Sequence, residues 1–356
     1  MIVIVFPHDW PHKSPTLLQL LEDINRERLE YELYLPINAK KNWELNKAKY
    51  FDASLNLFSR TAIRALTYFS FLDNFLINYV ARNILNKDIK IKNGDTLICF
   101  DFFGYNSIIR QHSFKKKYIF STELFLYHKD IFNLLGLQDV CLIIQSNIRA
   151  NFLGFSSSEN VRILDNVKID QEFISLSKVV NDQYIRSGLL YSGSICPELG
   201  EKILQKLGQD SKRTYQLTIH GDINISVEQV NKLTIIKEFL SDFYLKELML
   251  KSKVGIVLYD FKHISRLRSF NFETGPSGKL LKYILCGLPV IGNKCDGLIE
   301  VERFNAGILL KNLTAEEINL AYNKINENYD FYKKGVRKLF LEILNRRESV
   351  ELSRWF

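Results

Sequence analysis

The chain has 356 residues, of which 46% are hydrophobic and 25% charged, and its formal net charge is +8. This composition excludes a disordered chain, and the length predicts two domains that each bury a core of their own. The mild positive charge suits an anionic ligand or an anionic membrane surface better than duplex nucleic acid, which requires a concentrated basic stripe. No nucleic-acid partner is therefore expected.

The cysteines and the N-terminal segment bear on the cellular compartment. The five cysteines are scattered and none has zinc-ligand spacing, which favours buried thiols in a reducing cytosol and no metal site. Met1–Phe6 is too short and uncharged for a signal peptide, and no apolar run approaches the ~20 residues of a spanning helix. We expect a cytoplasmic protein, with peripheral association at the inner face of the plasma membrane left open.

Strand-like runs alternate with helical stretches, which predicts an α/β protein with parallel sheets. Helices are expected at Thr16–Arg28, within Leu55–Leu85 and at Phe243–Lys253. Strands of the first half are expected at Ile2–Phe6, Tyr31–Leu35, Thr96–Phe100, Tyr118–Phe120, Cys141–Gln145 and Val161–Leu164. Strands of the second half are expected at Leu189–Ser192, Tyr215–His220, Leu233–Ile236, Val254–Tyr259, Pro289–Ile291 and Gly307–Leu310.

The shared rhythm of the two halves predicts two doubly wound, Rossmann-like domains that face each other across a cleft. The expected limits are residues 1–175 for the first domain and 183–330 for the second, followed by a C-terminal helix in residues 331–356 that packs back toward the first domain. In such sheets ligands bind beyond the carboxyl ends of the strands.

One stretch of the first half has two interpretations. Phe58–Lys92 is rich in aromatic and aliphatic residues with interspersed lysines and arginines, and Lys115–Lys117 adds further positive charge. These residues form either core helices with solvated basic faces or a surface that meets anionic lipid.

Polar side chains follow three strands of the first half. His8 comes after the first strand, and Asp101 and Glu123 come after two later ones. Because parallel strands end at one edge of their sheet, these residues are candidates for acid–base chemistry or for binding hydroxyl groups. Each is alternatively a local turn residue.

The run Gly275–Ile291 predicts a turn, one amphipathic helix and a buried strand. Pro276 and Ser277 are helix-start signals, the latter by side-chain capping, and Gly287 provides a left-handed stop. The turn presents the backbone N–H groups of Ser277, Gly278 and Lys279 at a positive helix end, where a phosphate is favourable. The structural alternative is a helix start alone.

The order of motifs in the second half resembles the nucleotide-sugar domain of GT-B glycosyltransferases, most closely glycosyltransferase family 4. The resemblance covers roughly residues 185–312. The motifs that carry it are the strand and turn at Leu189–Gly200, the strand that ends at Gly221, the helix and strand within Phe243–Tyr259, the run Gly275–Ile291, and the segments Cys295–Val301 and Asn305–Leu310.

The resemblance implies a role for several residues. The donor diphosphate would be bound by the backbone amides of Ser277 and Gly278, by the charge of Lys279, and by the turn at Gly193 and Ser194. An acid before the turn holds sugar hydroxyls in this family, which here means Glu273. Glu300 is a further donor-site candidate, or else a cap of the following helix.

The sequence also departs from the family pattern. Lys282 stands where an acid normally grips the ribose, and Ser194 and Leu199 stand where the family tends to place Arg and Lys. The cations that could replace the missing ones are Lys279, Lys282, Arg266 and Arg268.

The resemblance implies a glycosyltransferase that moves a hexose-type sugar from a nucleotide diphosphate, most simply a UDP-sugar, to a cell-surface glycan or lipid-linked acceptor. No resident cofactor is expected, and the lack of an Asp-x-Asp pair favours metal-independent chemistry. Retention of the anomeric configuration is the family expectation; an inverting enzyme would need His8, Asp101 or Glu123 as a base. Two alternatives stay open, a nucleotide-sugar epimerase and a non-catalytic partner of an active transferase.

Overall fold

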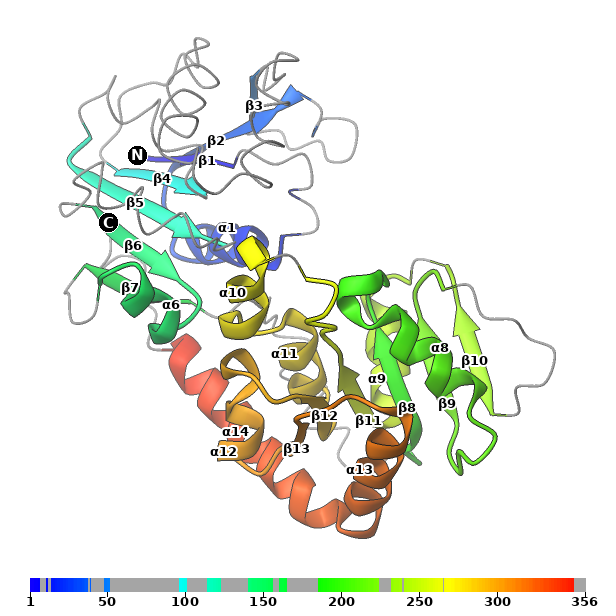
Figure 1. Ribbon diagram of the computed structural model, residues 1–356. Coiled ribbons are helices and arrows are strands. Elements are labelled where there is room, and N and C mark those ends of the chain that lie inside the picture. The colour runs from blue at the N-terminus through cyan, green and yellow to red at the C-terminus, as the bar shows by residue number, and fades with distance from the viewer. Residues whose placement is uncertain are drawn as a thin grey trace. The chain divides into compact units, whose positions relative to one another are not determined.

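The computed structural model describes residues 1–6, 11, 14–37, 39, 48–51, 96–100, 114–122, 140–155, 160–164, 185–223, 232–238, 240–264 and 266–348. The chain divides into two compact units (Figure 1). Unit 1 is Met1–Lys168 with Val350–Phe356, and unit 2 is Ile169–Ser349.

Unit 1 contains a parallel sheet of seven strands in the order β3-β2-β1-β4-β5-β6-β7. The strands are β1 (Ile2–Val5), β2 (Tyr31–Pro36), β3 (Ala48–Phe51), β4 (Thr96–Phe100), β5 (Lys116–Ser121), β6 (Cys141–Ile144) and β7 (Val161–Ile163). The helices described here are α1 (Pro15–Arg26) and α6 (Asn147–Phe152). Because β1 and β4 are buried along their whole length, they read as continuous apolar runs, as parallel strands covered on both faces do.

Helix α1 is fixed to this sheet by its cap and its apolar face. The Leu17 backbone N–H donates to the Ser14 hydroxyl at 3.3 Å, which satisfies one of the free donors at the helix start. Leu17, Leu20 and Ile24 share the spacing of one helix face and are fully buried in a single apolar cluster with strand residues of the sheet.

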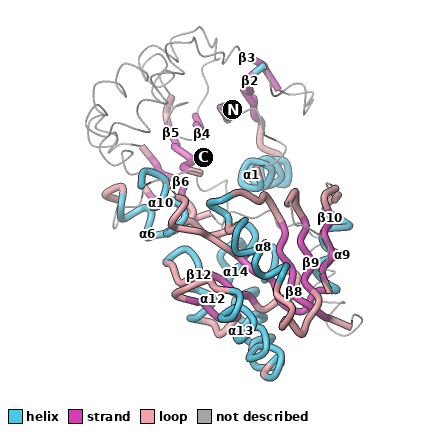
Figure 2. Tube along the Cα trace, turned by 45° about the vertical axis from the view of Figure 1, so that its right-hand side comes forward, coloured by secondary structure: helices cyan, strands magenta, loops and turns pink. Residues whose placement is uncertain are grey.

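Unit 2 contains a parallel sheet of six strands in the order β10-β9-β8-β11-β12-β13. The strands are β8 (Ser187–Ser192), β9 (Leu217–His220), β10 (Leu233–Ile236), β11 (Ser252–Val257), β12 (Val290–Asn293) and β13 (Gly307–Leu310). The helices are α8 (Glu201–Gln209), α9 (Asp242–Lys251), α10 (Arg266–Thr274), α11 (Gly278–Leu285), α12 (Glu300–Arg303), α13 (Ala315–Glu327) and α14 (Tyr329–Glu348). Helices and strands alternate along most of this unit (Figure 2), and the strand order is that of the doubly wound dinucleotide-binding fold.

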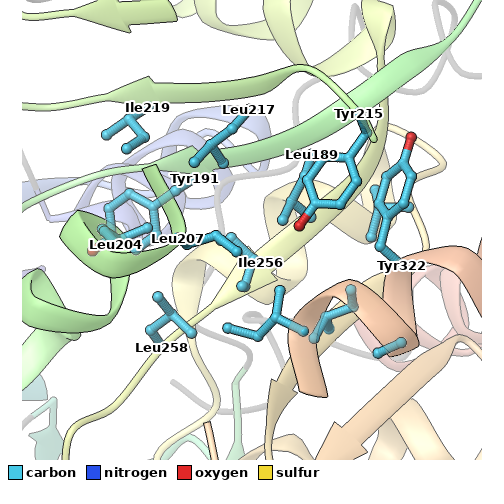
Figure 3. Close-up of a cluster of buried hydrophobic side chains, with 14 of the residues drawn as sticks. Leu189, Tyr191, Leu204, Leu207, Tyr215, Leu217, Ile219, Ile256, Leu258 and Tyr322 are labelled. Carbon is cyan, nitrogen blue, oxygen red and sulfur yellow. The ribbon is translucent and has the colours of Figure 1, made fainter. Parts of the chain in front are cut away.

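Alternate strand residues of unit 2 face two different helix layers. Leu189, Tyr191 and Ile256 lie in one buried cluster with Leu204 and Leu207 of α8 (Figure 3). The same cluster includes the stacked rings of Tyr215 and Tyr322, whose centroids are 3.9 Å apart. The residue next to Ile256, Gly255, lies instead against the ring of Tyr283 of α11. The period-two alternation of a strand thus places α8 and α11 on opposite faces of the sheet.

Helix α14 packs against α11, α12, α13 and β13 of its own unit. Tyr332, Val336, Leu339 and Ile343 form its buried stripe. Close approach is possible because Gly335 lacks a side chain: a Cβ there would lie 2.1 Å from the backbone oxygen of Asn305. The predicted packing of residues 331–356 toward the first domain stays a prediction. So do the predicted limits of the two domains.

Every strand expected from the sequence is present, with ends that differ by a few residues at most. The short strand β3 was not predicted. The helix expected within Leu55–Leu85, and the segment Phe58–Lys92, lie outside the described residues.

The close packing of Gly335 against the backbone at Asn305 predicts that Gly335→Ala destabilises the protein by about 1–3 kcal/mol, because the new methyl group must push α14 away from that backbone. Chemical unfolding in urea measures this change. The matched control is Asn345→Ala on the exposed side of the same helix, where the gain in helix propensity should stabilise slightly. Stabilisation by both variants would contradict the close approach at Gly335.

Candidate functional site

The two central strands of unit 2, β8 and β11, mark the point where the strand order reverses. Strands β9 and β10 lie on one side of this pair and β12 and β13 on the other. The chain segments that leave the carboxyl ends of β8 and β11 therefore diverge, and open parallel sheets bind their ligands at such a point. The strand pairing runs as far as Leu190 and Gly255, and β8 continues to Ser192 beyond it.

Tyr283 of α11 occupies the place where this pairing ends. Its fully buried hydroxyl accepts a hydrogen bond from the Ser192 backbone N–H at 2.9 Å and donates to the Leu190 carbonyl at 3.3 Å. A Cβ on Gly255 would lie only 2.5 Å from Cδ2 of the Tyr283 ring. The glycine thus admits the ring, and the ring anchors α11 beside the end of β8.

Helix α11 has well-defined ends. The Gly287 and Leu288 N–H groups donate to the carbonyls of Ile284 and Tyr283, both at 2.9 Å, and Gly287 has a φ of +76°. This is the Schellman arrangement, so the stop predicted at Gly287 is confirmed. The Arg186 guanidinium donates to the Cys286 carbonyl at 2.9 Å, which places a cation at the negative end of the helix.

The start of α11 differs from the prediction in one respect. Ser277 is the N-cap residue, but its side chain makes no capping hydrogen bond. Tyr259 lies two residues beyond the end of β11, and burial raises its pKa to about 12, an effect that nearby Ser277 reduces in part. The predicted side-chain cap was therefore wrong, although the helix begins where the sequence predicted.

Lys279 links the start of α11 to the end of β8. Its ammonium donates to the Tyr191 hydroxyl at 2.8 Å and lies 4.5 Å from the centroid of the same ring. The Tyr191 hydroxyl donates in turn to the Ser194 carbonyl at 2.6 Å. Two segments 88 residues apart in sequence are thereby joined at one strand end.

The turn after β8 has room for this lysine because it contains glycine. Gly193 has a φ of +136°, and a Cβ on it would lie 2.5 Å from Lys279 Cε. The next turn follows the same rule: Gly221, after β9, has a φ of +148° and approaches the Gly193 carbonyl closely. The structure thus brings together five of the predicted donor-site residues, which are Gly193, Ser194, Ser277, Gly278 and Lys279.

Burial lowers the pKa of the Lys279 amine to about 8, and the nearby Cys196 thiol opposes this shift only in part. The amine is therefore mainly charged at neutral pH and loses its charge in mild alkali. A cation partly removed from water attracts an anion more strongly than a solvated one does, because the lower dielectric screens it less.

His220 ends β9, the strand paired with β8, and Lys282 of α11 lies near enough to influence its charge. His220 Nε2 lies 3.2 Å from the Glu238 carbonyl, an acceptor, and Nδ1 lies 2.8 Å from the Ser192 hydroxyl. These contacts assign the proton to Nε2, so that the Ser192 hydroxyl donates to Nδ1. Burial, and to a smaller degree the charge of Lys282, lowers the His220 pKa. The imidazole is therefore neutral at neutral pH.

The other predicted residues have different surroundings. Glu273 lies on α10 with an exposed side chain, close enough to Cys295 to contribute to the raised pKa of that thiol. Both oxygens of Glu300 accept from the guanidinium of Arg346, at 2.6 and 3.2 Å, so this carboxylate joins α12 to α14. Arg266 and Arg268 begin α10, and their side chains are outside the described part of the chain. The remaining candidates, His8, Asp101 and Glu123, are outside the described residues altogether.

Sequence reasoning missed the two tyrosines that organise the site, Tyr191 and Tyr283. Both stand in apolar runs, where a tyrosine is indistinguishable from a core aromatic. The only available signal for Tyr191 was its position two residues before the glycine of the β8 turn.

Among the described residues, no group of three or more His, Cys, Asp or Glu side chains is placed to hold a metal ion. Within the same residues, no helix has both the length and the apolar character needed to cross a membrane.

Comparison with known proteins identifies the fold. The sequence matches no protein-family model and no characterised protein. The structure is similar to trehalose-6-phosphate synthase OtsA, with 8% identity and a TM-score of 0.61 over 97% of this chain and 95% of that one. It is also similar to HepE from Anabaena in complex with UDP and glucose, with 14% identity and a TM-score of 0.60 over 97% and 95% of the two chains.

A third similar structure is WaaG, a glycosyltransferase involved in lipopolysaccharide biosynthesis, with 11% identity and a TM-score of 0.55 over 99% of this chain and 96% of that one. At these identities the likeness shows the fold. The chain has the two doubly wound α/β units of the GT-B glycosyltransferase fold.

The environment of Lys279 predicts a specific pH dependence of stability. The pKa falls from 10.5 in the unfolded chain to about 8 in the folded one, so the unfolded state binds more protons between these values. The free energy of unfolding of the unaltered protein should therefore rise, relative to that of Lys279→Met, by at most about 3 kcal/mol as the pH increases from 8 to 10.5.

Urea unfolding of both proteins across this pH range measures the difference. The control is Lys202→Met on α8, whose side chain is exposed and which should give a pH-independent difference. If the free energy of unfolding changed with pH in the same way for the unaltered protein and Lys279→Met, the prediction would be wrong, because the Lys279 amine would titrate as a solvated lysine does.

Proposed function

We propose that the chain is a glycosyltransferase, closest to glycosyltransferase family 4, that transfers a hexose-type sugar from a nucleotide diphosphate to a cell-surface glycan or lipid-linked acceptor. The observation that carries the proposal is the convergence of Lys279, the Gly193 turn and the start of α11 at the point where the strand order reverses. The GT-B fold supports it, as does the structural similarity to HepE, which has been solved in complex with UDP-glucose. We take a UDP-sugar as the donor.

The chemistry we propose is electrostatic. Departure of the sugar leaves negative charge on the diphosphate, and the Lys279 ammonium and the first-turn N–H groups of α11 would stabilise that charge. These groups serve without a metal ion or resident cofactor. Glu273 would hold hydroxyl groups of the sugar, and the anomeric configuration would be retained.

The acceptor belongs to the same proposal. The similar WaaG is described as acting in lipopolysaccharide biosynthesis, and the sequence of this chain contains the basic, aromatic segment Phe58–Lys92. Both observations support a lipid-linked acceptor at the cytoplasmic face of the membrane. On this view the protein is cytoplasmic and peripheral to the membrane.

A non-catalytic GT-B partner is the second candidate, and a specific observation favours it. Ser194 and Leu199 provide no cations in the turn after β8, and Lys282 replaces the acid expected near the ribose. Such a protein would bind a nucleotide without turnover.

The first test is binding of UDP, GDP, ADP and CMP, measured by the change that each causes in the melting temperature of the protein. A ligand at ~100 times its dissociation constant stabilises the folded state by about 2.7 kcal/mol, which gives a measurable shift. We expect one nucleoside diphosphate to raise the melting temperature, and Lys279→Ala to abolish the shift. Lys202→Ala, which removes an exposed lysine of the same unit, is the control and should keep it.

Release of the nucleotide from the matching nucleotide sugar then separates the two candidates. Turnover supports the transferase, whereas tight binding without turnover supports the non-catalytic partner. If no nucleotide binds to the unaltered protein, the donor site is wrong.

A further inference from the structure

We propose that Tyr191 is the positioning residue of this site: its hydroxyl and ring hold the Lys279 ammonium over the Gly193 turn, where the ammonium meets the phosphates of the ligand. The role assigned to the ammonium rests on the proposed function, but the placement of the ammonium by Tyr191 does not. Tyr191 is fully buried, so it is not itself in reach of a ligand.

The hydrogen bonds around Tyr191 fix which group donates to which. A phenol has one proton, and Tyr191 gives it to the Ser194 carbonyl, 2.6 Å away. Burial raises the pKa of Tyr191, so the phenol keeps that proton. The contact with Lys279 at 2.8 Å must then be a donation from lysine to the phenol oxygen. An ammonium has three N–H groups, so two remain for a ligand.

The ring and the neighbouring turn restrict the lysine further. The Tyr191 ring lies 4.5 Å from Nζ, a distance at which the ring face favours the charged amine. Lys279 Cε also occupies the space that a side chain at position 193 would take. The lysine chain is thus held between a ring and a glycine turn, which reduces the conformational entropy it loses when a ligand binds.

The titratable groups around the pair do not supply an ion-pair partner for Lys279 within the described residues. Cys196, in the loop after β8, acts to raise the pKa of both Lys279 and Tyr191. Its thiol donates to the Glu198 carboxylate at 3.3 Å. Tyr259 beyond β11 and Tyr283 on α11 lie near enough to add to the raised pKa of Tyr191, and burial raises the pKa of both. Besides the Cys196 thiol, the phenol oxygen and the ring of Tyr191 are the groups in contact with the amine that favour its charged form against the cost of burial.

Tyr191→Phe separates positioning from packing, because it keeps the ring and removes only the hydroxyl. The matched control is Tyr215→Phe, which removes a buried hydroxyl that donates to Asn319 Oδ1 of α13 at 2.7 Å and has no part in holding α11 or Lys279. Both variants lose a buried hydrogen bond and should lose stability. Only Tyr191→Phe should change the titration of Lys279.

The titration is followed by NMR of the protein labelled with ¹³C at lysine Cε, with the Lys279 signal assigned by its absence in Lys279→Met. The unaltered protein should titrate near pH 8. Tyr191→Phe should lower this midpoint by about one pH unit and weaken binding of the nucleoside diphosphate on the order of ten-fold. Tyr215→Phe should leave the midpoint unchanged. An identical midpoint in Tyr191→Phe and the unaltered protein would overturn the proposal.

Two further readings complete the test. In the unaltered protein, ¹³C relaxation should show Lys279 Cε as restricted and Cε of the exposed Lys202 as mobile; a mobile Lys279 overturns the proposal even if Tyr191→Phe does not fold. If the midpoint moves as expected but no nucleoside diphosphate binds to the unaltered protein, the positioning role of Tyr191 stands and the proposed function fails.

Discussion

The hydrogen bonds of the Tyr283 hydroxyl to the β8 backbone are the constraint on which the rest of the site depends. The chain segments that follow two adjacent parallel strands here leave in opposite directions. The backbone N–H and C=O groups where the strand pairing ends therefore lack partners from the neighbouring strand. Here the phenol bonds to both the Ser192 N–H and the Leu190 carbonyl. Since Tyr283 belongs to α11, satisfying the strand also fixes the position and rotation of the helix. The first turn of α11 is consequently held at the end of β8.

Glycines permit the close approaches that this arrangement requires. Gly255 makes room for the Tyr283 ring, Gly193 for the Lys279 side chain, and Gly335 for the backbone beneath α14. In each case a single methyl group would occupy space already filled by another segment. These contacts join parts of the chain that are distant in sequence, so the glycines act as packing residues rather than as sources of flexibility.

The strands could be predicted from the sequence because local signals determine them. Buried parallel strands are apolar runs bounded by turn residues, and Gly287 marks the end of α11 through its left-handed conformation. Strand β3, with the sequence Ala-Lys-Tyr-Phe, lacks such a signal. The pair of Glu300 with Arg346, 46 residues away, depends on a tertiary contact that no local pattern encodes. The same limit concealed Tyr191, whose neighbours in sequence resemble those of any core tyrosine.

The departures of this sequence from the glycosyltransferase pattern acquire a physical meaning in the structure. A cation is missing from the turn after β8, but Lys279 of α11 extends over that turn and is held there by the strand residue Tyr191. Positive charge is therefore present at the strand end although it originates from a different segment. What a phosphate experiences is the position of the charge and its solvation, not the segment that provides it. A lysine partly buried against an aromatic ring is already desolvated and ordered, so it can replace a solvated cation of the turn at a smaller entropic cost.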